Sequence, residues 1–266
     1  KNKLLNMGNQ NRKLFFLIAL PRSGNTLFTS IINQNPEIAC TGNSVTLEIM
    51  KNLYLIKTTD TFKNFPDYKS LDNVLNNVYN LYYKDWPQRI IIDRGPALMS
   101  ANPGNFELMQ KHFKAGFKCI VLLRDLMEVF ASYIKWYTEN PDSFVNKLGK
   151  TDEEKLLALM KEDGAIVKEI KSIQNSYNYP NMCHFIRYND MVADPEKVFK
   201  ELYKFLDELY YPHQFQNLKQ ININDIEYDD TVVGKNMHTI KTIVKKETNN
   251  YIVPKSIKEK YGHIKI

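Results

Sequence analysis

Cysteine is scarce in this chain of 266 residues, and its three cysteines, Cys40, Cys119 and Cys183, lie far apart. This spacing argues against a disulfide framework and a thiolate zinc cage, and it favours a reducing compartment. Long apolar runs are also missing. Residues 14–20, one of the longest runs, fall far short of the roughly 20 residues that cross a bilayer, and no signal-peptide pattern precedes them. We therefore expect a soluble, cytoplasmic protein without a stable membrane span.

A strong excess of one charge is absent as well. Lysine and arginine number 36 against 30 acidic residues, and the resulting net charge of +6 is spread evenly. This charge is too mild for a dedicated nucleic-acid-binding surface, but it permits an anionic ligand. The five histidines show no metal-ligand spacing. With 43% hydrophobic residues and no low-complexity linker or repeat, the composition predicts an ordinary globular domain.

Apolar stretches typical of buried strands alternate along the chain with segments of helical periodicity. The expected strands are residues 13–20, 89–93, 117–123 and 183–188. The expected helices are residues 27–32, 44–56, 106–114, 125–137 and 151–177, and one that begins at Asp194-Pro195. This alternation predicts an α/β fold in which a central parallel sheet is flanked by helices on both faces.

We expect a single domain over residues 1–266. Residues 57–88 are aromatic, rich in asparagine and weakly periodic, so we interpret them as a variable insertion on the substrate side. Residues beyond 211 are polar and irregular.

A polar turn, residues 21–26, follows the first expected strand. In parallel α/β folds ligands bind beyond the carboxyl ends of the strands, where helix N-termini favour anions. Arg22 adds a permanent charge there, and the main chain and side chains of the next residues offer hydrogen-bond donors. The expected phosphate-binding residues are Arg22, Ser23, Gly24, Asn25, Thr26 and Leu27. The alternative is that Gly24 only permits a turn and Arg22 is a solvated surface charge.

This turn lacks the first glycine and the lysine of the nucleotide P-loop template, G-x-x-x-x-G-K-(S/T), so ATP is not the natural inference. It resembles instead a loop of the sulfotransferase family, P-(K/R)-(S/T)-G-(T/S)-T. The resemblance implies a P-loop-like domain whose loop holds the 5′ side of the sulfate donor 3′-phosphoadenosine 5′-phosphosulfate (PAPS). The version with Arg22 is similar to the branch of tyrosylprotein and bacterial sulfotransferases, and Asn25 departs from the usual Thr or Ser.

Later segments match the same family in order. Arg124 ends the third expected strand and Ser132 follows on the next helix, a separation of 132 − 124 = 8. The resemblance implies that this pair binds the 3′-phosphate, and a guanidinium fork with a hydroxyl suits a phosphate dianion. Tyr188, in a segment similar to the family's Y-x-D-M…P, is implied to contact the adenine. The alternatives are a pairing of Arg124 with Asp125, an ordinary helix serine and a tyrosine packed on the core.

The C-terminal part contains a looser match, Gly234 to Lys241, to the G…H-x-(I/V)-(R/K) segment of bacterial members. The resemblance implies that residues 230–247 form a basic loop over the donor, with contacts from Lys235, His238 and Lys241. The alternative is a solvated run of charge.

The resemblance implies in-line transfer of a sulfuryl group from PAPS to a hydroxyl or amine, which leaves 3′-phosphoadenosine 5′-phosphate (PAP). This group carries less charge than a γ-phosphoryl group, so arginine and backbone donors replace Mg²⁺ and we expect no metal. Arg22 is predicted to stabilise the bridging oxygen as its bond to sulfur breaks. Arg94 ends the second expected strand, where relatives place an active-site Lys or His.

An acceptor hydroxyl must also lose a proton. Arg94 cannot accept it at neutral pH, and the glutamate that the tyrosylprotein type carries in a Gly-Glu-Glu segment is absent from residues 40–44. Glu48, one turn into the next helix, is the predicted catalytic replacement. Asp93 is the second candidate, although strand alternation points it away from whatever Arg94 faces. Either carboxylate is alternatively a structural ion-pair partner.

Two competing functions remain at this point. The first is a nucleotide kinase that uses ATP–Mg²⁺, with Asp93 as the metal ligand, and the second is a non-catalytic nucleotide-binding module. The acceptor is a small molecule or a biopolymer that bears a hydroxyl. Aromatic residues of the insertion are candidates for its pocket or for the core: Phe62, Phe65, Tyr68, Tyr82, Tyr83 and Trp86.

Overall fold

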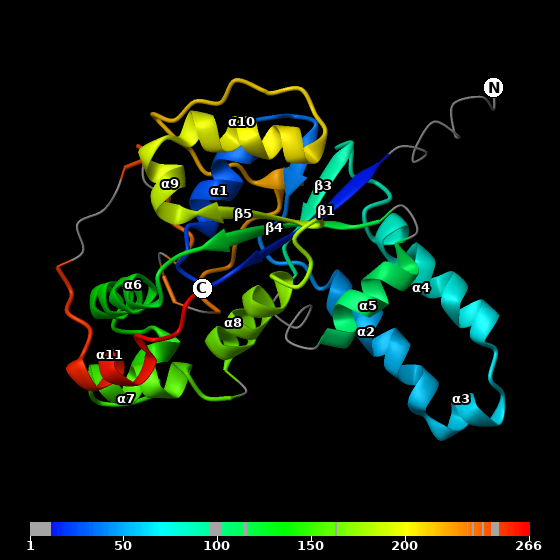
Figure 1. Ribbon diagram of the computed structural model, residues 1–266, viewed down its shortest axis with the longest axis horizontal. Coiled ribbons are helices and arrows are strands. Elements are labelled where there is room, and N and C mark those ends of the chain that lie inside the picture. Colours follow the sequence, from blue (N-terminus) through cyan, green and yellow to red (C-terminus); the bar gives the residue numbers. More distant parts are fainter. Residues whose placement is uncertain are drawn as a thin grey trace.

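A computed structural model of the chain describes residues 12–95, 103–113, 116–162, 164–232, 234–235, 237–240, 242–245 and 250–266. At its centre lies a parallel sheet with the strand order β2-β3-β1-β4-β5 (Figure 1). The strands are β1 (Lys13–Ala19), β2 (Ile38–Cys40), β3 (Ile90–Asp93), β4 (Lys118–Leu123) and β5 (Cys183–Arg187). The predicted α/β fold is confirmed, and β2 is a strand that the sequence pattern did not reveal.

The central strand β1 is buried on both faces. Side chains alternate across a strand, so Phe15 and Leu17 pack into one apolar cluster while Phe16 and Ile18 pack into the other. A strand in this position needs apolar side chains at every residue, which explains the uninterrupted run that predicted it.

Helices α1 (Asn25–Ile32), α9 (Tyr188–Ala193) and α10 (Pro195–Leu206) supply the apolar side chains of one cluster and cover one face of the sheet (Figure 1). The expected start of α10 is confirmed. Asp194 caps the helix by accepting a hydrogen bond from the Lys197 amide at 3.1 Å, and Pro195 occupies the first turn.

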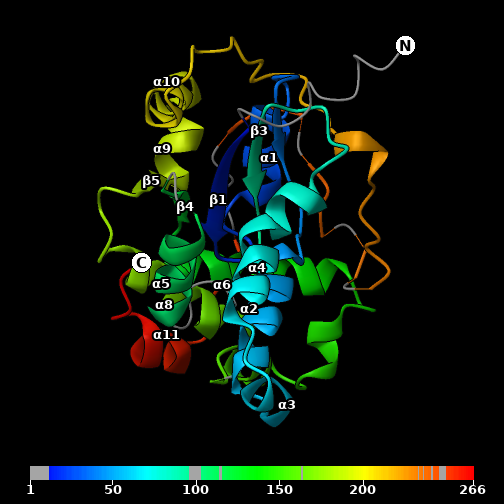
Figure 2. The same ribbon diagram turned by 90° about the vertical axis from the view of Figure 1, so that its right-hand side faces the viewer.

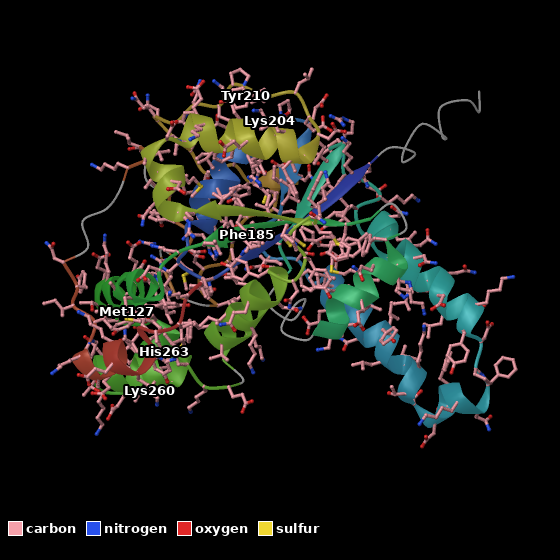
Figure 3. The ribbon with its side chains drawn as sticks, in the orientation of Figure 1. Met127, Phe185, Lys204, Tyr210, Lys260 and His263 are labelled. Atoms are coloured by element: carbon pink, nitrogen blue, oxygen red, sulfur yellow. The ribbon has the colours of Figure 1, made fainter. Side chains whose placement is uncertain are left out.

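The other face is covered by a larger group of helices (Figure 2). They are α2 (Thr46–Leu55), α4 (Tyr68–Tyr82), α5 (Pro103–His112), α6 (Leu126–Glu139), α7 (Asp152–Leu159), α8 (Ala165–Ser176) and α11 (Lys255–Tyr261). Asp125 caps α6 as expected, and Thr151 and Glu154 form the expected capping box of α7. Polar side chains such as Lys204 on α10 and Lys260 on α11 lie on the outer surface (Figure 3). Among the described residues, no helix combines the length and apolar character needed to cross a bilayer.

Two regions differ from the sequence-based expectation. The helix expected over residues 151–177 is interrupted, because α7 ends at Leu159 and α8 begins only at Ala165. The insertion at residues 57–88 is largely helical, with α4 preceded by η1 (Ile56–Thr58) and α3 (Asp60–Asn64). Together with α2 these helices form an arm that extends from the sheet (Figure 1). The remaining short elements are η3 (Phe144–Lys147) and η4 (Ile223–Asp225).

Candidate functional site

The turn between β1 and α1 is shaped by the carbonyl oxygen of Leu20. That oxygen accepts hydrogen bonds from the Ser23 amide at 3.2 Å, the Ser23 hydroxyl at 2.6 Å and the Asn25 side-chain amide at 3.0 Å. Arg22 and Gly24 adopt left-handed backbone conformations, with φ values of 65° and 96°. The turn is therefore held in one shape by its own side chains.

Gly24 is required by its surroundings as well as by its backbone. A Cβ atom at this position would lie 2.7 Å from Cδ2 of Tyr188 and 3.2 Å from the terminal methyl of Met191. The backbone of the turn therefore packs directly on the start of α9, and the glycine permits this close approach.

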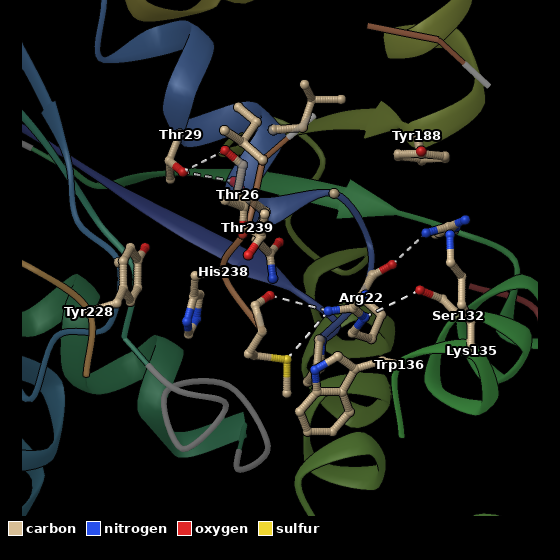
Figure 4. Close-up of a pocket in the computed structure, with 18 of the residues that line it drawn as sticks. Arg22, Thr26, Thr29, Ser132, Lys135, Trp136, Tyr188, Tyr228, His238 and Thr239 are labelled. Atoms are coloured by element: carbon tan, nitrogen blue, oxygen red, sulfur yellow. Dashed lines mark hydrogen bonds between the residues drawn. The ribbon is translucent and has the colours of Figure 1, made fainter. Parts of the chain in front are cut away.

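A cavity of about 540 Å³ opens beyond this turn, at the carboxyl ends of β1 and β4 (Figure 4). We call it the first cavity. Its described lining contains one carboxylate, Glu139, against five cationic side chains: Arg22, Arg94, Arg124, Lys135 and Lys245. Such a set of side chains favours an anionic ligand.

The structure brings the predicted 5′ and 3′ phosphate-binding groups to this same cavity. Gly24, Asn25, Thr26 and Leu27 line it together with Arg22, and so do Arg124, Ser132 and Tyr188 from three other elements. Ser23 does not line it, because its side chain is fully buried and its hydroxyl is bonded to Leu20. The Ser23 side chain therefore shapes the turn, and a contact of Ser23 with a ligand stays a prediction.

Arg22 and Arg124 connect the two groups. The Arg124 guanidinium donates a hydrogen bond to the Arg22 carbonyl oxygen at 2.6 Å, and its Cζ lies 4.1 Å from the centre of the Tyr188 ring. The Arg22 guanidinium donates from Nε to the Ser132 hydroxyl at 3.2 Å and from Nη1 to the Met237 carbonyl oxygen at 3.2 Å (Figure 4). Arg22 therefore reaches from the turn to both α6 and the C-terminal segment.

The C-terminal segment contributes His238, which lines the first cavity. Its Nδ1 forms a hydrogen bond with Oδ1 of Asp230 at 2.5 Å, and its ring stacks on Tyr228 with 3.8 Å between the ring centres (Figure 4). Burial lowers the pKa of His238 below its usual value, the hydrogen bond to Asp230 opposes this, and the nearby guanidinium groups of Arg94 and Arg22 add to the lowering. The lowered pKa favours the neutral form of the imidazole.

Of the other expected residues in this segment, Lys235 is exposed and does not line the cavity. Its backbone carbonyl oxygen accepts a hydrogen bond from Nε1 of Trp136 at 3.1 Å. The backbone of Lys235 therefore has a structural role, and a contact of its side chain with the donor stays a prediction. Lys241 lies outside the described residues.

A second cavity, of about 370 Å³, shares part of its wall with the first. Residues that line both are Thr26, Thr29, Gly42, Asn43, Tyr228 and His238. Arg94 lines the first cavity at this boundary, where its Nη1 donates to the Gly42 carbonyl oxygen at 2.8 Å and to Oδ1 of Asn43 at 2.5 Å. Of the insertion's aromatic residues, Tyr82, Tyr83 and Trp86 line the second cavity.

The structure gives neither predicted carboxylate a place at these cavities. Glu48 is exposed on α2, whereas its neighbours Thr46 and Leu47 are buried, so the helix turns Glu48 away from the site. Asp93 is fully buried and accepts hydrogen bonds from the Ser44 hydroxyl at 2.8 Å and the Tyr83 hydroxyl at 2.5 Å. Burial raises the pKa of Asp93 to about 6, against the effect of these two hydrogen bonds. Asp93 is therefore a structural group behind the cavity wall.

Sequence reasoning missed several residues of the site. Lys135 and Trp136 line the first cavity three and four residues after Ser132 on α6, a spacing that shares one helix face and would have indicated them. Tyr228 and Asp230 lie in an irregular segment, where no periodicity pointed to them.

Comparison with known proteins gives a consistent result. A family model described as the Sulfotransferase family matches residues 15–213. A Caenorhabditis briggsae protein named "Putative protein-tyrosine sulfotransferase" is 22% identical over 237 residues, which cover 85% of this chain and 78% of that protein.

Two solved structures share the fold. The sulfotransferase domain from the curacin biosynthetic pathway superposes with a TM-score of 0.50 at 20% identity, over 96% of this chain and 92% of that chain. The sulfotransferase domain from the Synechococcus PCC 7002 olefin synthase has a TM-score of 0.53 at 17% identity, over 85% and 84% of the two chains.

Proposed function

The chain belongs to the sulfotransferase family, and we propose that it transfers a sulfuryl group from PAPS, bound in the first cavity, to a hydroxyl group of an acceptor. The observation that carries this proposal is that the turn at residues 21–27 and the Arg124–Ser132 pair border one cavity. PAPS carries one phosphate at the 5′ position of its ribose and another at the 3′ position. One molecule is therefore able to contact the turn and the Arg124–Ser132 pair at the same time.

In this proposal the 5′ end of the donor meets the N-terminus of α1, whose first amides have no partner within the helix. Arg124 and Ser132 bind the 3′-phosphate through charge-assisted hydrogen bonds. The Tyr188 ring, already packed against the Arg124 guanidinium, stacks on the adenine.

The transfer forms a bond between the acceptor oxygen and sulfur while the bond from sulfur to the 5′-phosphate oxygen breaks. The electron pair of the broken bond stays on PAP, where Arg22 stabilises the developing negative charge. Arg22 is within hydrogen-bond distance of Ser132, which supports a position between the two phosphate sites.

The proton of the acceptor hydroxyl needs a base, and we assign this role to His238 in place of Glu48. His238 lines both cavities, and its Nδ1 is bonded to Asp230, which leaves Nε2 to accept the proton. Its lowered pKa supports a neutral imidazole at working pH. Asp230 is then a positioning residue that fixes the tautomer.

The acceptor class remains a small molecule or a biopolymer with a hydroxyl, and the cytoplasmic location and the single-domain extent over residues 1–266 remain predictions. All three cysteines are buried and free, which supports a reducing compartment.

The proposed function is tested by incubating the protein with PAPS and a panel of phenols and alcohols and measuring release of PAP. Acceptor-dependent PAP release is the expected result. Binding of ATP–Mg²⁺ with no response to PAPS would support a kinase, and PAP binding without turnover of any acceptor would support a non-catalytic module.

A further inference from the structure

The two adjoining cavities differ sharply in the charge of their described linings. The first cavity has five lysine or arginine side chains and one carboxylate. The second cavity has no lysine or arginine among its described lining residues, and it has two carboxylates, Glu227 and Asp229. The two ligands of the reaction would therefore meet opposite electrostatic environments.

The second cavity also has an aromatic and aliphatic wall. Tyr83 packs edge-to-face against Tyr82, with ring centres 5.0 Å apart, and against Trp86, with ring centres 4.8 Å apart. Ile223 and Ile226 line the same cavity. Its volume of about 370 Å³ falls in the range of small-molecule sites, which is roughly 300–1,000 Å³.

One residue of the aromatic wall, Tyr83, is anchored inside the protein. Tyr83 is 1% exposed, and its hydroxyl donates to Oδ2 of buried Asp93 while Ser44 donates to the same oxygen. The polar end of Tyr83 is thereby used inside the protein, and its buried ring supports Tyr82 and Trp86, which are more exposed.

A cationic side chain, the Arg94 guanidinium, lies beside the wall that the two cavities share. It lines the first cavity and is bonded to Gly42 and Asn43 of the shared wall. Its charge therefore lies at the boundary between the cavities, whereas the charged side chains that line the second cavity itself are Glu227 and Asp229.

We propose that the second cavity is the acceptor site and that it selects a neutral or cationic hydroxyl compound with an aromatic or alkyl body, against compounds that carry an anionic group. This inference rests on the proposed sulfuryl transfer and adds the chemistry of the acceptor to it. It follows that a hydroxyl flanked by carboxylates, as in a tyrosine of an acidic peptide, is a poor acceptor.

The test compares 2-naphthol, which is neutral at pH 7, with 6-hydroxy-2-naphthoate and with an acidic tyrosyl peptide. Binding of each compound to the protein is measured by calorimetry with and without PAP, and transfer from PAPS is measured in parallel. We expect 2-naphthol to bind and to react with a kcat/KM about tenfold or more above that of either anionic compound.

A charge-reversal variant sharpens this test. Glu227→Lys should raise the affinity for the naphthoate relative to 2-naphthol by about fivefold. Glu201→Lys, at an exposed carboxylate on α10 that lines neither cavity, is the matched control and should leave the ratio unchanged.

Failure of 2-naphthol to bind, equal affinity for the anionic compounds, or an unchanged ratio in Glu227→Lys would overturn the inference. Because binding is measured apart from turnover, these outcomes are distinct from a failure of the proposed function, which would show as absence of PAP binding or of PAP release.

Discussion

The guanidinium of Arg124 donates a hydrogen bond to the backbone carbonyl oxygen of Arg22 over 2.6 Å. This bond joins the end of β4 to the turn after β1, two segments separated by about a hundred residues of sequence. It fixes the distance between the proposed sites of the 3′-phosphate and the 5′-phosphate, so a ligand that fills one site finds the other already formed.

Replacement of Arg124 should weaken PAP binding strongly. Arg124→Ala removes charge-assisted hydrogen bonds worth about 1.5–3 kcal/mol, so we expect the Kd for PAP to rise about 10- to 100-fold and the thermal stabilisation by PAP to shrink. Lys150→Ala, at an exposed lysine outside both cavities, is the control. Equal effects of the two changes would count against the assignment of Arg124.

Gly24→Ala should damage both the fold of the turn and ligand binding. Gly24 and Gly116 both have positive φ values, but only at Gly24 would a Cβ atom meet another residue, Tyr188. Both alanine variants should lose about 1–2 kcal/mol of unfolding free energy from backbone strain. Only Gly24→Ala should also lose PAP affinity, as measured by calorimetry. If Gly116→Ala weakened PAP binding to the same degree, the contact with Tyr188 would not be the cause.

The pH dependence of turnover should report on His238. Activity is expected to fall as the pH drops through the lowered pKa of His238, because a protonated imidazole cannot accept the acceptor's proton. His238→Ala should reduce kcat about 100-fold or more and remove this acid limb, whereas PAP still binds. The control His263→Ala, at an exposed position near the C-terminus, should keep the parent profile.

Asp230→Asn tests the positioning role separately. Asp230 raises the pKa of His238, so its loss should move the acid limb to lower pH while kcat falls. An unmoved limb in this variant would show that Asp230 does not act through His238.

Asp93 should make the protein less stable as the pH rises. Its pKa in the folded state, about 6, lies above the unfolded value of roughly 3.9, so the folded state holds the proton more tightly. Its contribution to the free energy of unfolding, on the order of 2–3 kcal/mol, is fully present below about pH 4 and is lost as the pH rises through 6. Relative to the parent, Asp93→Asn should therefore gain unfolding free energy between pH 4 and pH 7 in denaturant titrations. Asp85→Asn, at an exposed site, should show no such gain.

Much of the fold could be predicted from the sequence because β1 is buried on both faces and therefore carries an unbroken apolar run. The three-residue strand β2 is too short for such a signal. In the insertion, Leu71, Leu75, Val78 and Tyr82 recur at the spacing of one helix face and would have indicated α4. The five residues of α3 are too few to show a helical period.

The sequence predicted that Arg22, Arg124 and Ser132 come together at one cavity, because the two arginines follow the ends of β1 and β4 and Ser132 lies on the next helix, α6. The residue that accepts the proton could not be predicted from the sequence. The position of Glu48 along the chain predicts that it is the base, but the rotation of α2 turns it to the surface. His238 and Asp230 are brought together by an irregular segment, and their hydrogen bond has no counterpart in any sequence period.

The five cationic side chains around the first cavity have a kinetic consequence for the proposed reaction. The phosphates that they would bind are present in both PAPS and PAP. These side chains therefore bind the nucleotide equally well before and after the sulfuryl group is transferred. Release of PAP is then the rate-limiting step: the first turnover is fast, and each later turnover is limited by the dissociation of PAP.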